Sequence, residues 1–231
     1  MFTSHVKNQK GFTLIELMIS ISILTLLLFT GSYTYSLMSE RWNKELGQFS
    51  ESVRTLKSIE ILQRALEGVH SFVVVNDKNK PSFFFIGDGD SLLSVTRSGI
   101  FTSDYPEIFR ISAIKNEQGL FDLVYQAEST QNVLLTGTDQ SIEFNNDITL
   151  FNDIEDISFT YFGWHSFVSK SFRAESGDKP LWYTRFSGID NQMMPENFQL
   201  ILKREGVELV IPIRLEQNSE RWLSPYIENQ E

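Results

Sequence analysis

The chain begins with a long apolar stretch that carries almost no charge. Between Phe12 and Met38 the only formally charged residue is Glu16. As an α-helix this stretch would extend about 40 Å, more than the ~30 Å hydrocarbon core of a bilayer. Lys7 and Lys10 precede it, so the positive-inside rule places the chain's start in the cytoplasm and everything after the stretch outside. The pattern predicts one membrane-spanning helix.

A second helical pattern follows, with its apolar residues on one face. They recur every three or four positions, at Leu46, Phe49, Val53, Leu56, Ile59, Leu62, Leu66 and Val69. This spacing predicts an amphipathic helix that buries its stripe against the rest of the chain, with Gly68 as a stop signal. Joined to the first stretch, it predicts one long helix over residues 12–69. A separate amphipathic helix behind a simple anchor is the alternative.

From Ser71 onward, short β-branched and aromatic runs replace the helical period. The expected strands are 71–75, 82–86, 92–96, 108–114, 120–127, 133–136, 142–144, 148–151, 154–162, 198–203 and 207–215. The last two form the clearest hairpin, and Pro212 marks its second strand as an edge or a bend. The stretch Gly163–Pro195 reads as a long irregular loop. The pattern therefore predicts an α+β fold, with a long N-terminal helix packed on an antiparallel β-rich C-terminal domain.

Basic residues followed by apolar ones also mark secretory signal peptides and uncleaved signal anchors. A signal peptide fits poorly, because no small-residue cleavage site follows the apolar run, where Gly31-Ser32-Tyr33 is the nearest approach. A plain anchor does not account for Glu16, since a carboxylate inside a spanning helix costs at least ~2.5 kcal/mol. We therefore expect Glu16 to have a functional partner.

The segment Lys10-Gly11-Phe12-Thr13-Leu14-Ile15-Glu16-Leu17-Met18 resembles the processing signature of type IV prepilins and type II secretion pseudopilins. The resemblance implies that a membrane-embedded prepilin peptidase cuts between Gly11 and Phe12 and methylates the new α-amine of Phe12. It also implies that Glu16 pairs with the terminal amine of a neighbouring subunit in a filament.

The same resemblance implies a division of the chain into four parts. They are a cytoplasmic leader that is removed (1–11), a transmembrane half-helix (12–38), a periplasmic amphipathic half-helix (39–70) and a periplasmic β-rich globular domain (71–231). The protein would lie in the bacterial inner membrane as a single-pass protein.

The signature has a physical basis of its own. Glycine at position 11 leaves the backbone unobstructed beside the scissile bond. Cleavage there creates a cation at the cytoplasmic end of the helix, and Glu16 lies about one turn further along on the same face. An intrachain pair at the lipid surface is the alternative to a pair between subunits.

The β-rich half resembles the J-type minor pseudopilins of type II secretion, the GspJ/PulJ family. The resemblance covers most of the chain in the order of its features and in its size. The likeness rests on Ile157–Phe162 running to Trp164, a later Trp182, and Met193-Met194-Pro195 before an apolar alternating strand. It implies a pilin-like fold and a structural role in the tip complex that initiates the periplasmic pseudopilus and helps export folded proteins.

The implied partners are minor pseudopilins of the I, K and H types, the major pseudopilin, the prepilin peptidase and membrane lipid. The tip-most member of that family generally lacks the acidic fifth residue of the mature chain. The presence of Glu16 therefore favours a position below the extreme tip.

Composition and charge exclude several other classes. The chain has 20 Lys+Arg against 30 Asp+Glu, a formal net charge of −10, which disfavours general attraction to nucleic acid. With 41% hydrophobic residues and 19 Phe it is too apolar to be disordered. The absence of cysteine excludes disulfides, thiolate metal sites and a cysteine nucleophile.

We expect neither catalysis nor a bound cofactor or metal. His5, His70 and His165 are not at metal-ligand spacing, and no G-x-S-x-G elbow occurs. Asp88-Gly89-Asp90 superficially suggests calcium ligation, but the rest of an EF-hand loop is missing. The acidic group Asp153, Glu155 and Asp156 is expected to be a solvated strand edge.

Two other functions remain open. The chain could be a minor pilin of a type IV pilus, serving assembly, adhesion or DNA uptake. In a different class, its β domain could be a binding module, an adhesin or a DNA-uptake subunit. The nucleic-acid version would need a cationic face, for which the candidates are Arg173, Lys179, Arg185, Lys203 and Arg204.

Overall fold

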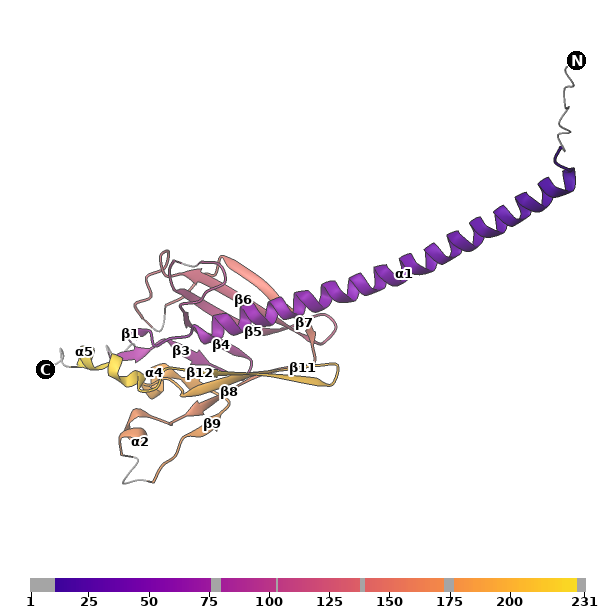
Figure 1. The fold of residues 1–231 in the computed structure, drawn as a ribbon. Helices are drawn as coiled ribbons and strands as arrows, with labels where there is room; N and C mark the ends of the chain where they lie inside the picture. Colours follow the sequence, from indigo (N-terminus) through magenta and orange to yellow (C-terminus); the bar gives the residue numbers. More distant parts are fainter. Residues whose placement is uncertain (1–10, 76–79, 103, 138–139, 173–176, 228–231) are drawn as a thin grey trace, which may run out of the picture. The chain divides into compact units, whose positions relative to one another are not determined.

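The structure is a computed structural model of the whole chain (Figure 1). It describes residues 11–75, 80–102, 104–137, 140–172 and 177–227. A long helix, α1, runs from Leu14 to Glu67. The chain divides into two compact units, one ending at Arg54 and the other beginning at Thr55. Except for Gly11, the expected leader lies outside the described residues.

The second unit contains three antiparallel sheets. The six-stranded sheet has the order β10-β3-β4-β5-β6-β7, with β3 Phe85–Gly87, β4 Ser91–Thr96, β5 Glu107–Lys115, β6 Phe121–Ser129, β7 Asn146–Ile154 and β10 Phe186–Ser187. The four-stranded sheet has the order β12-β11-β8-β9, with β8 Asp156–Gly163, β9 Leu181–Tyr183, β11 Asn197–Arg204 and β12 Val207–Arg214. Strands β1 (Val73–Val75) and β2 (Pro81–Phe83) form the two-stranded sheet. The predicted α+β fold is confirmed, and the arrangement is consistent with a pilin-like fold.

Within the described residues, four short helical segments accompany the strands. They are α2 (Phe167–Ser171), α4 (Gly188–Asn191), the 3₁₀ helix η1 (Ser219–Trp222) and α5 (Ser224–Ile227).

The last turns of α1 bury one side of the helix in the main core. Leu62, Ala65 and Leu66 are fully buried there, and Ile59 is partly buried. Around them pack inward-facing residues of the two larger sheets, among them Phe85, Leu92, Phe109, Tyr125, Phe159, Tyr161, Phe198, Leu200, Ile211 and Ile213. This part of the predicted stripe is therefore buried as expected.

The earlier part of the stripe is not buried. Leu46, Phe49, Val53 and Leu56 are all exposed, the least of them, Val53, by 46%. Leu56 belongs to the second unit and is exposed there, so the expectation is wrong for this residue. Leu46, Phe49 and Val53 belong to the first unit, and their packing against the β domain stays a prediction.

Gly68 ends α1, as predicted from sequence. Its amide donates to the Arg64 carbonyl oxygen at 3.1 Å. A Cβ on Gly68 would lie 2.4 Å from Oγ1 of Thr96, so only glycine fits this approach to β4. The helix ends before Val69, which the sequence pattern had included, because Val69 forms an isolated β-bridge with Thr96.

The predicted C-terminal hairpin is confirmed. Strands β11 and β12 pair in register, with Phe198 opposite Ile213. Glu205 and Gly206 form the turn between them, at φ 52° and 75°. Pro212 lies in β12, which is the outermost strand of its sheet, where a missing amide donor is tolerated.

Two predicted strands are wrong. Residues 133–136 and 142–144 form no strand. Leu134 is exposed, but Val133, Leu135, Ile142 and Phe144 pack in a second cluster, with Leu135 buried. This cluster also holds Val74, Phe84, Val95 and Ile108. The segment is anchored by the buried Glu128, which accepts hydrogen bonds from the side-chain amides of Asn132 and Asn145, both at 2.8 Å. Apolar residues can thus be buried by loop packing without a strand ladder.

The stretch Gly163–Pro195 is more regular than predicted. It contains α2, β9, β10 and α4. Strand β9 extends the four-stranded sheet by pairing with β8, and β10 extends the six-stranded sheet by pairing with β3. The prediction of an irregular loop fails because strands this short leave no measurable alternation in the sequence.

A buried carboxylate holds the loop before β5. Glu107 is 1% exposed, and it accepts backbone hydrogen bonds from Ile100 (3.0 Å), Phe101 (2.8 Å) and Thr102. The Tyr125 hydroxyl donates to the same carboxylate at 3.2 Å. Burial, followed by the charge of Glu107, raises the pKa of Tyr125 above its ordinary range, so this hydroxyl remains a donor.

Replacing Glu107 by alanine is expected to lower the free energy of unfolding by about 3–5 kcal/mol, because buried donors lose their acceptor. Urea denaturation of the full chain in detergent would measure this. The matched control is Glu208→Ala in β12, an exposed position, where the expected change is within ~0.5 kcal/mol. A loss of less than about 1 kcal/mol for Glu107→Ala would contradict the assignment.

A half-buried histidine makes the stability of the domain depend on pH. Burial, followed by the charge of Arg97, lowers the pKa of His70 from 6.5 to about 4, and Glu216 acts in the opposite direction. Among the described residues Nδ1 of His70 has no hydrogen-bond partner. Because the folded state holds His70 neutral, the unfolded chain binds the proton first as the pH falls.

The stability that His70 contributes is complete above about pH 6.5 and is lost as the pH falls towards about 4. Since the ring is partly exposed, we expect a loss of roughly 2 kcal/mol. The measurement is the free energy of unfolding of the chain and of His70→Gln across this range. The variant lacks the titration of His70. If the free energy of unfolding changes with pH equally in the natural chain and in His70→Gln, the effect is disproved.

Candidate functional site

The residues before α1 form a capping box. Oε2 of Glu16 accepts hydrogen bonds from the backbone amide of Thr13 and from its hydroxyl, both at 2.9 Å. The Glu16 amide donates to Oγ1 of Thr13 at 3.4 Å. These bonds satisfy amide groups that a helix N-terminus leaves unpaired. The helix therefore begins at Leu14, later than the predicted Phe12, because Thr13 serves as the N-cap.

The apolar residues that follow are uncovered. From Phe12 to Met38 every described side chain is exposed. Among the described residues, α1 is the one helix long and apolar enough to cross a membrane. This confirms a candidate spanning helix at the predicted place.

Five hydroxyl groups inside this stretch are satisfied within the helix. Each donates to the carbonyl oxygen one turn earlier, at 2.8–2.9 Å, and they belong to Ser20, Ser22, Thr25, Thr30 and Thr34. Such bonding lets a hydroxyl enter hydrocarbon at little cost. Glu16 is left as the one formal charge of the stretch.

The surroundings of Gly11 are open. An added Cβ would meet nothing within 4 Å, and Gly11 does not adopt a positive φ. The fold therefore places no demand on glycine here, so a requirement for glycine would come from an enzyme that binds this segment. Cleavage after Gly11 would create an α-amine on Phe12, beside Thr13 and close in sequence to the Glu16 carboxylate.

Comparison with known families decides what this arrangement is. Residues 6–31 match the family model described as the prokaryotic N-terminal methylation motif. The chain carries a prokaryotic N-terminal methylation motif. This motif is typical of type IV pilins and pseudopilins, and it implies processing by a prepilin peptidase and assembly with other pilins. A search among curated proteins found no match.

The methylation motif accounts for the N-terminus, and the other candidate residues are scattered. His5 lies outside the described residues, His70 follows α1, and His165 lies between β8 and α2. Within the described parts of the chain no group of three or more His, Cys, Asp or Glu is placed to hold a metal ion.

The acidic residues singled out from sequence have structural contacts. Asp88 pairs with Arg185, with Nε 2.5 Å from Oδ1, and its carbonyl accepts the Tyr161 hydroxyl at 2.9 Å. Asp153 is exposed and accepts a hydrogen bond from the side-chain amide of Asn116 at 2.9 Å. The Asp88 turn thus connects β3 and β4, and Asp153 lies exposed near the end of β7.

The candidate cations do not form one face. Lys203 and Arg204 lie at the end of β11 that pairs with the start of β8. Lys179 and Arg185 flank β9, which pairs with the end of β8. Arg173 lies outside the described residues. The described cations are therefore divided between opposite ends of one strand, which does not favour a DNA-binding surface.

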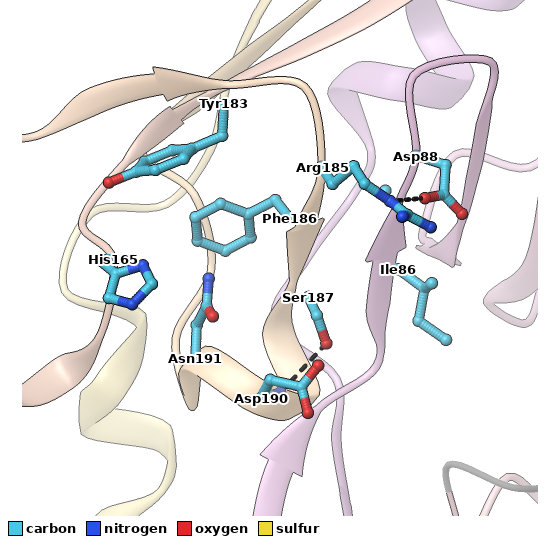
Figure 2. Close-up of a pocket in the computed structure, with 10 residues that line it drawn as sticks. Ile86, Asp88, His165, Tyr183, Arg185, Phe186, Ser187, Asp190 and Asn191 are labelled. Atoms are coloured by element: carbon cyan, nitrogen blue, oxygen red, sulfur yellow. Dashed lines mark hydrogen bonds and ion pairs between the residues drawn. The ribbon is translucent and has the colours of Figure 1, made fainter.

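A pocket of about 490 Å³ lies beside β10 (Figure 2). Phe186 and Tyr183 form apolar walls, and His165, Arg185 and Asp190 stand at its edge. Sequence reasoning missed it, because its residues come from short elements that only tertiary pairing brings together. Its mixture of charges does not define a single ligand.

Proposed function

We propose that this protein is a structural minor pseudopilin of a type II secretion system, of the J type. In this role it belongs to the tip complex that initiates the periplasmic pseudopilus and helps export folded proteins. The match of residues 6–31 to the methylation motif carries the pilin-like part of the proposal. The long N-terminal helix on an antiparallel β domain supports it, and so do the J-type likenesses at Trp164, Trp182 and Pro195.

In this proposal the prepilin peptidase removes residues 1–11 and methylates the amine of Phe12. The remaining chain is held in the inner membrane by one helix, with the β domain in the periplasm. No enzymatic activity is assigned to the chain itself, and its contribution is the surfaces on which subunits pack.

Glu16 connects maturation to assembly. In the single chain its carboxylate is occupied by Thr13, where it caps the helix. A cationic amine in hydrocarbon needs a counter-charge, and a neighbour's Glu16 supplies one. The capping bonds keep the carboxylate at the cytoplasmic end of the helix until such an amine arrives.

The exposed part of the apolar stripe provides the second packing surface. Leu46, Phe49 and Val53 lie at helical spacing and are exposed within the first unit, and Leu56, one turn further along, is exposed within the second. Helices of neighbouring subunits would bury these side chains in the filament. The partners in the proposal are minor pseudopilins of the I, K and H types and the major pseudopilin.

The test is co-purification of the full, processed chain with co-expressed I-, K- and H-type subunits in detergent. A stable heteromer supports the proposal. A chain that remains monomeric with every one of them overturns it.

A minor pilin of a type IV pilus is the second candidate, because the same motif serves both systems. It requires that the chain join pilus subunits and not secretion subunits. Running the same co-purification with pilus minor pilins distinguishes the two.

A further inference from the structure

The four outer strands of the two larger sheets differ in how their edges are protected. Strand β12 contains Pro212 and exposed charges. Strand β7 pairs with β6 with shifts in register, and it contains Asp153 at a positive φ. Proline, charge and bulges are devices that keep foreign strands from an edge. Strand β10 is only Phe186–Ser187.

Strand β9 has no proline, charge or bulge within its three residues, and Lys179 and Pro180 directly precede it. It consists of Leu181, Trp182 and Tyr183, and it pairs with β8 alone among the described strands. Its first two side chains are more than half exposed, although both are large and apolar. An apolar edge left open in this way is the kind that another strand extends.

Neighbouring residues enlarge the apolar surface. Phe167, Val168 and Phe172, in and after α2, are exposed as well. They belong to the same insertion between β8 and β10, and Figure 1 shows α2 and β9 at the border of the four-stranded sheet. We call the exposed residues of β9 and α2 the edge patch; they are Phe167, Val168, Phe172, Leu181 and Trp182.

Cations bracket the open strand. Lys179 precedes β9 and Arg185 follows it, and both are exposed. Arg185 pairs with Asp88 at the surface, an interaction worth at most about 1 kcal/mol. Its guanidinium has five N–H donors, so it can bind a second carboxylate. In a chain of net charge −10, this edge therefore attracts acidic groups at both of its ends.

We infer that β9 is a docking strand for an extended segment of a partner protein with apolar residues between two acidic ones. The segment adds to the open edge of β9, its apolar side chains contact the edge patch, and its carboxylates meet Lys179 and Arg185. The chain bends at Thr184, between β9 and Arg185, so the two acidic residues flank the paired stretch without a fixed spacing. Pro180 has no amide hydrogen, so backbone pairing is limited to the residues after it.

The inference goes beyond the proposed function, since it concerns the β domain and holds for a secretion or a pilus subunit. It is also independent of maturation. A full-length chain that carries Gly11→Val is expected to bind the same segment, so failure of processing and failure of docking are distinguishable.

The test is a selection of random peptides displayed on phage against the full chain in lipid nanodiscs. Selected peptides are expected to contain acidic residues on both sides of a short apolar run. A synthetic peptide of the selected sequence should slow amide hydrogen exchange at Leu181–Tyr183. Peptides without that pattern, or binding without such protection, would overturn strand addition.

A matched pair of variants locates the site. Leu181→Lys changes the first residue of β9, and Val207→Lys changes the first residue of β12, where the side chains are 59% and 69% exposed. We expect Leu181→Lys to weaken peptide binding by about tenfold or more, and Val207→Lys by less than about twofold. Equal binding by the two variants would overturn the site.

A charge reversal and a measurement of mass complete the test. Lys179→Glu with Arg185→Glu should shift the selected peptides from acidic to basic residues, and unchanged selection would contradict the charge argument.

The mass of the unliganded chain in solution shows whether a second copy occupies the edge. If the chain is a dimer and Leu181→Lys makes it monomeric, a second copy occupies the edge and the peptide proposal fails.

Discussion

Replacing Gly11 by valine is expected to block cleavage, so that the full-length chain accumulates in the membrane. The reason lies in the peptidase, because an added Cβ at Gly11 meets nothing within 4 Å in the chain itself. A β-branched side chain obstructs the backbone beside the scissile bond, whereas glycine leaves it open. The intact mass of the chain, purified from cells that contain an active prepilin peptidase, measures the result.

Gly31→Val is the matched control. Gly31 also lies in the N-terminal unit, and a Cβ there likewise meets nothing within 4 Å. This variant is expected to be processed normally. Normal cleavage of Gly11→Val, or equal blockage of both variants, would contradict the role of Gly11 as the residue before the cut.

Replacing Glu16 by alanine is expected to leave cleavage and methylation intact but to reduce assembly. A terminal amine without its carboxylate faces the cost of a lone charge in hydrocarbon, at least ~2.5 kcal/mol, which corresponds to a reduction of about 60-fold or more. The measurement is the yield of crosslinks between this subunit and a co-expressed partner, on chains whose processing has been verified.

Glu16→Gln separates the two roles of this residue. Glutamine also serves at this position of a capping box, so the start of α1 should be preserved while the charge is lost. We expect Glu16→Gln to assemble as poorly as Glu16→Ala. If it assembles like the natural chain, then Glu16 acts by capping the helix, and the pairing with an amine is wrong.

Much of the fold is readable from the sequence where periodicity is long. The apolar period of α1 and the alternation in β5, β6 and the β11–β12 hairpin extend over many residues, and those elements are confirmed. Where a segment is short, the period is not informative. Strands β9 and β10 have three and two residues, and they exist because β8 and β3 offer them edges.

Short β-branched and aromatic runs misled the prediction at residues 133–136 and 142–144 for a related reason. Such a run indicates apolar side chains that favour burial, and it does not indicate which backbone partner is available. Here the buried Glu128 fixes the segment through Asn132 and Asn145, so the apolar groups reach the second cluster from a loop.

The N-terminal site is readable because it is linear. Gly11, Phe12 and Glu16 stand in fixed register in the sequence, and the structure adds that Thr13 completes a capping box with Glu16. That box also has a sequence pattern, threonine followed three residues later by glutamate, which could have been noticed. The pocket and the edge patch depend on the placement of β9 and β10 and have no such pattern.

The N-terminus of the mature protein tests the central claim most directly. Mass spectrometry of the chain isolated from its native membrane would determine both the first residue and any modification of its amine. The account predicts a chain that begins at Phe12 and carries one methyl group on its α-amine. A chain that retains Met1, or that begins at any residue other than Phe12, would contradict it.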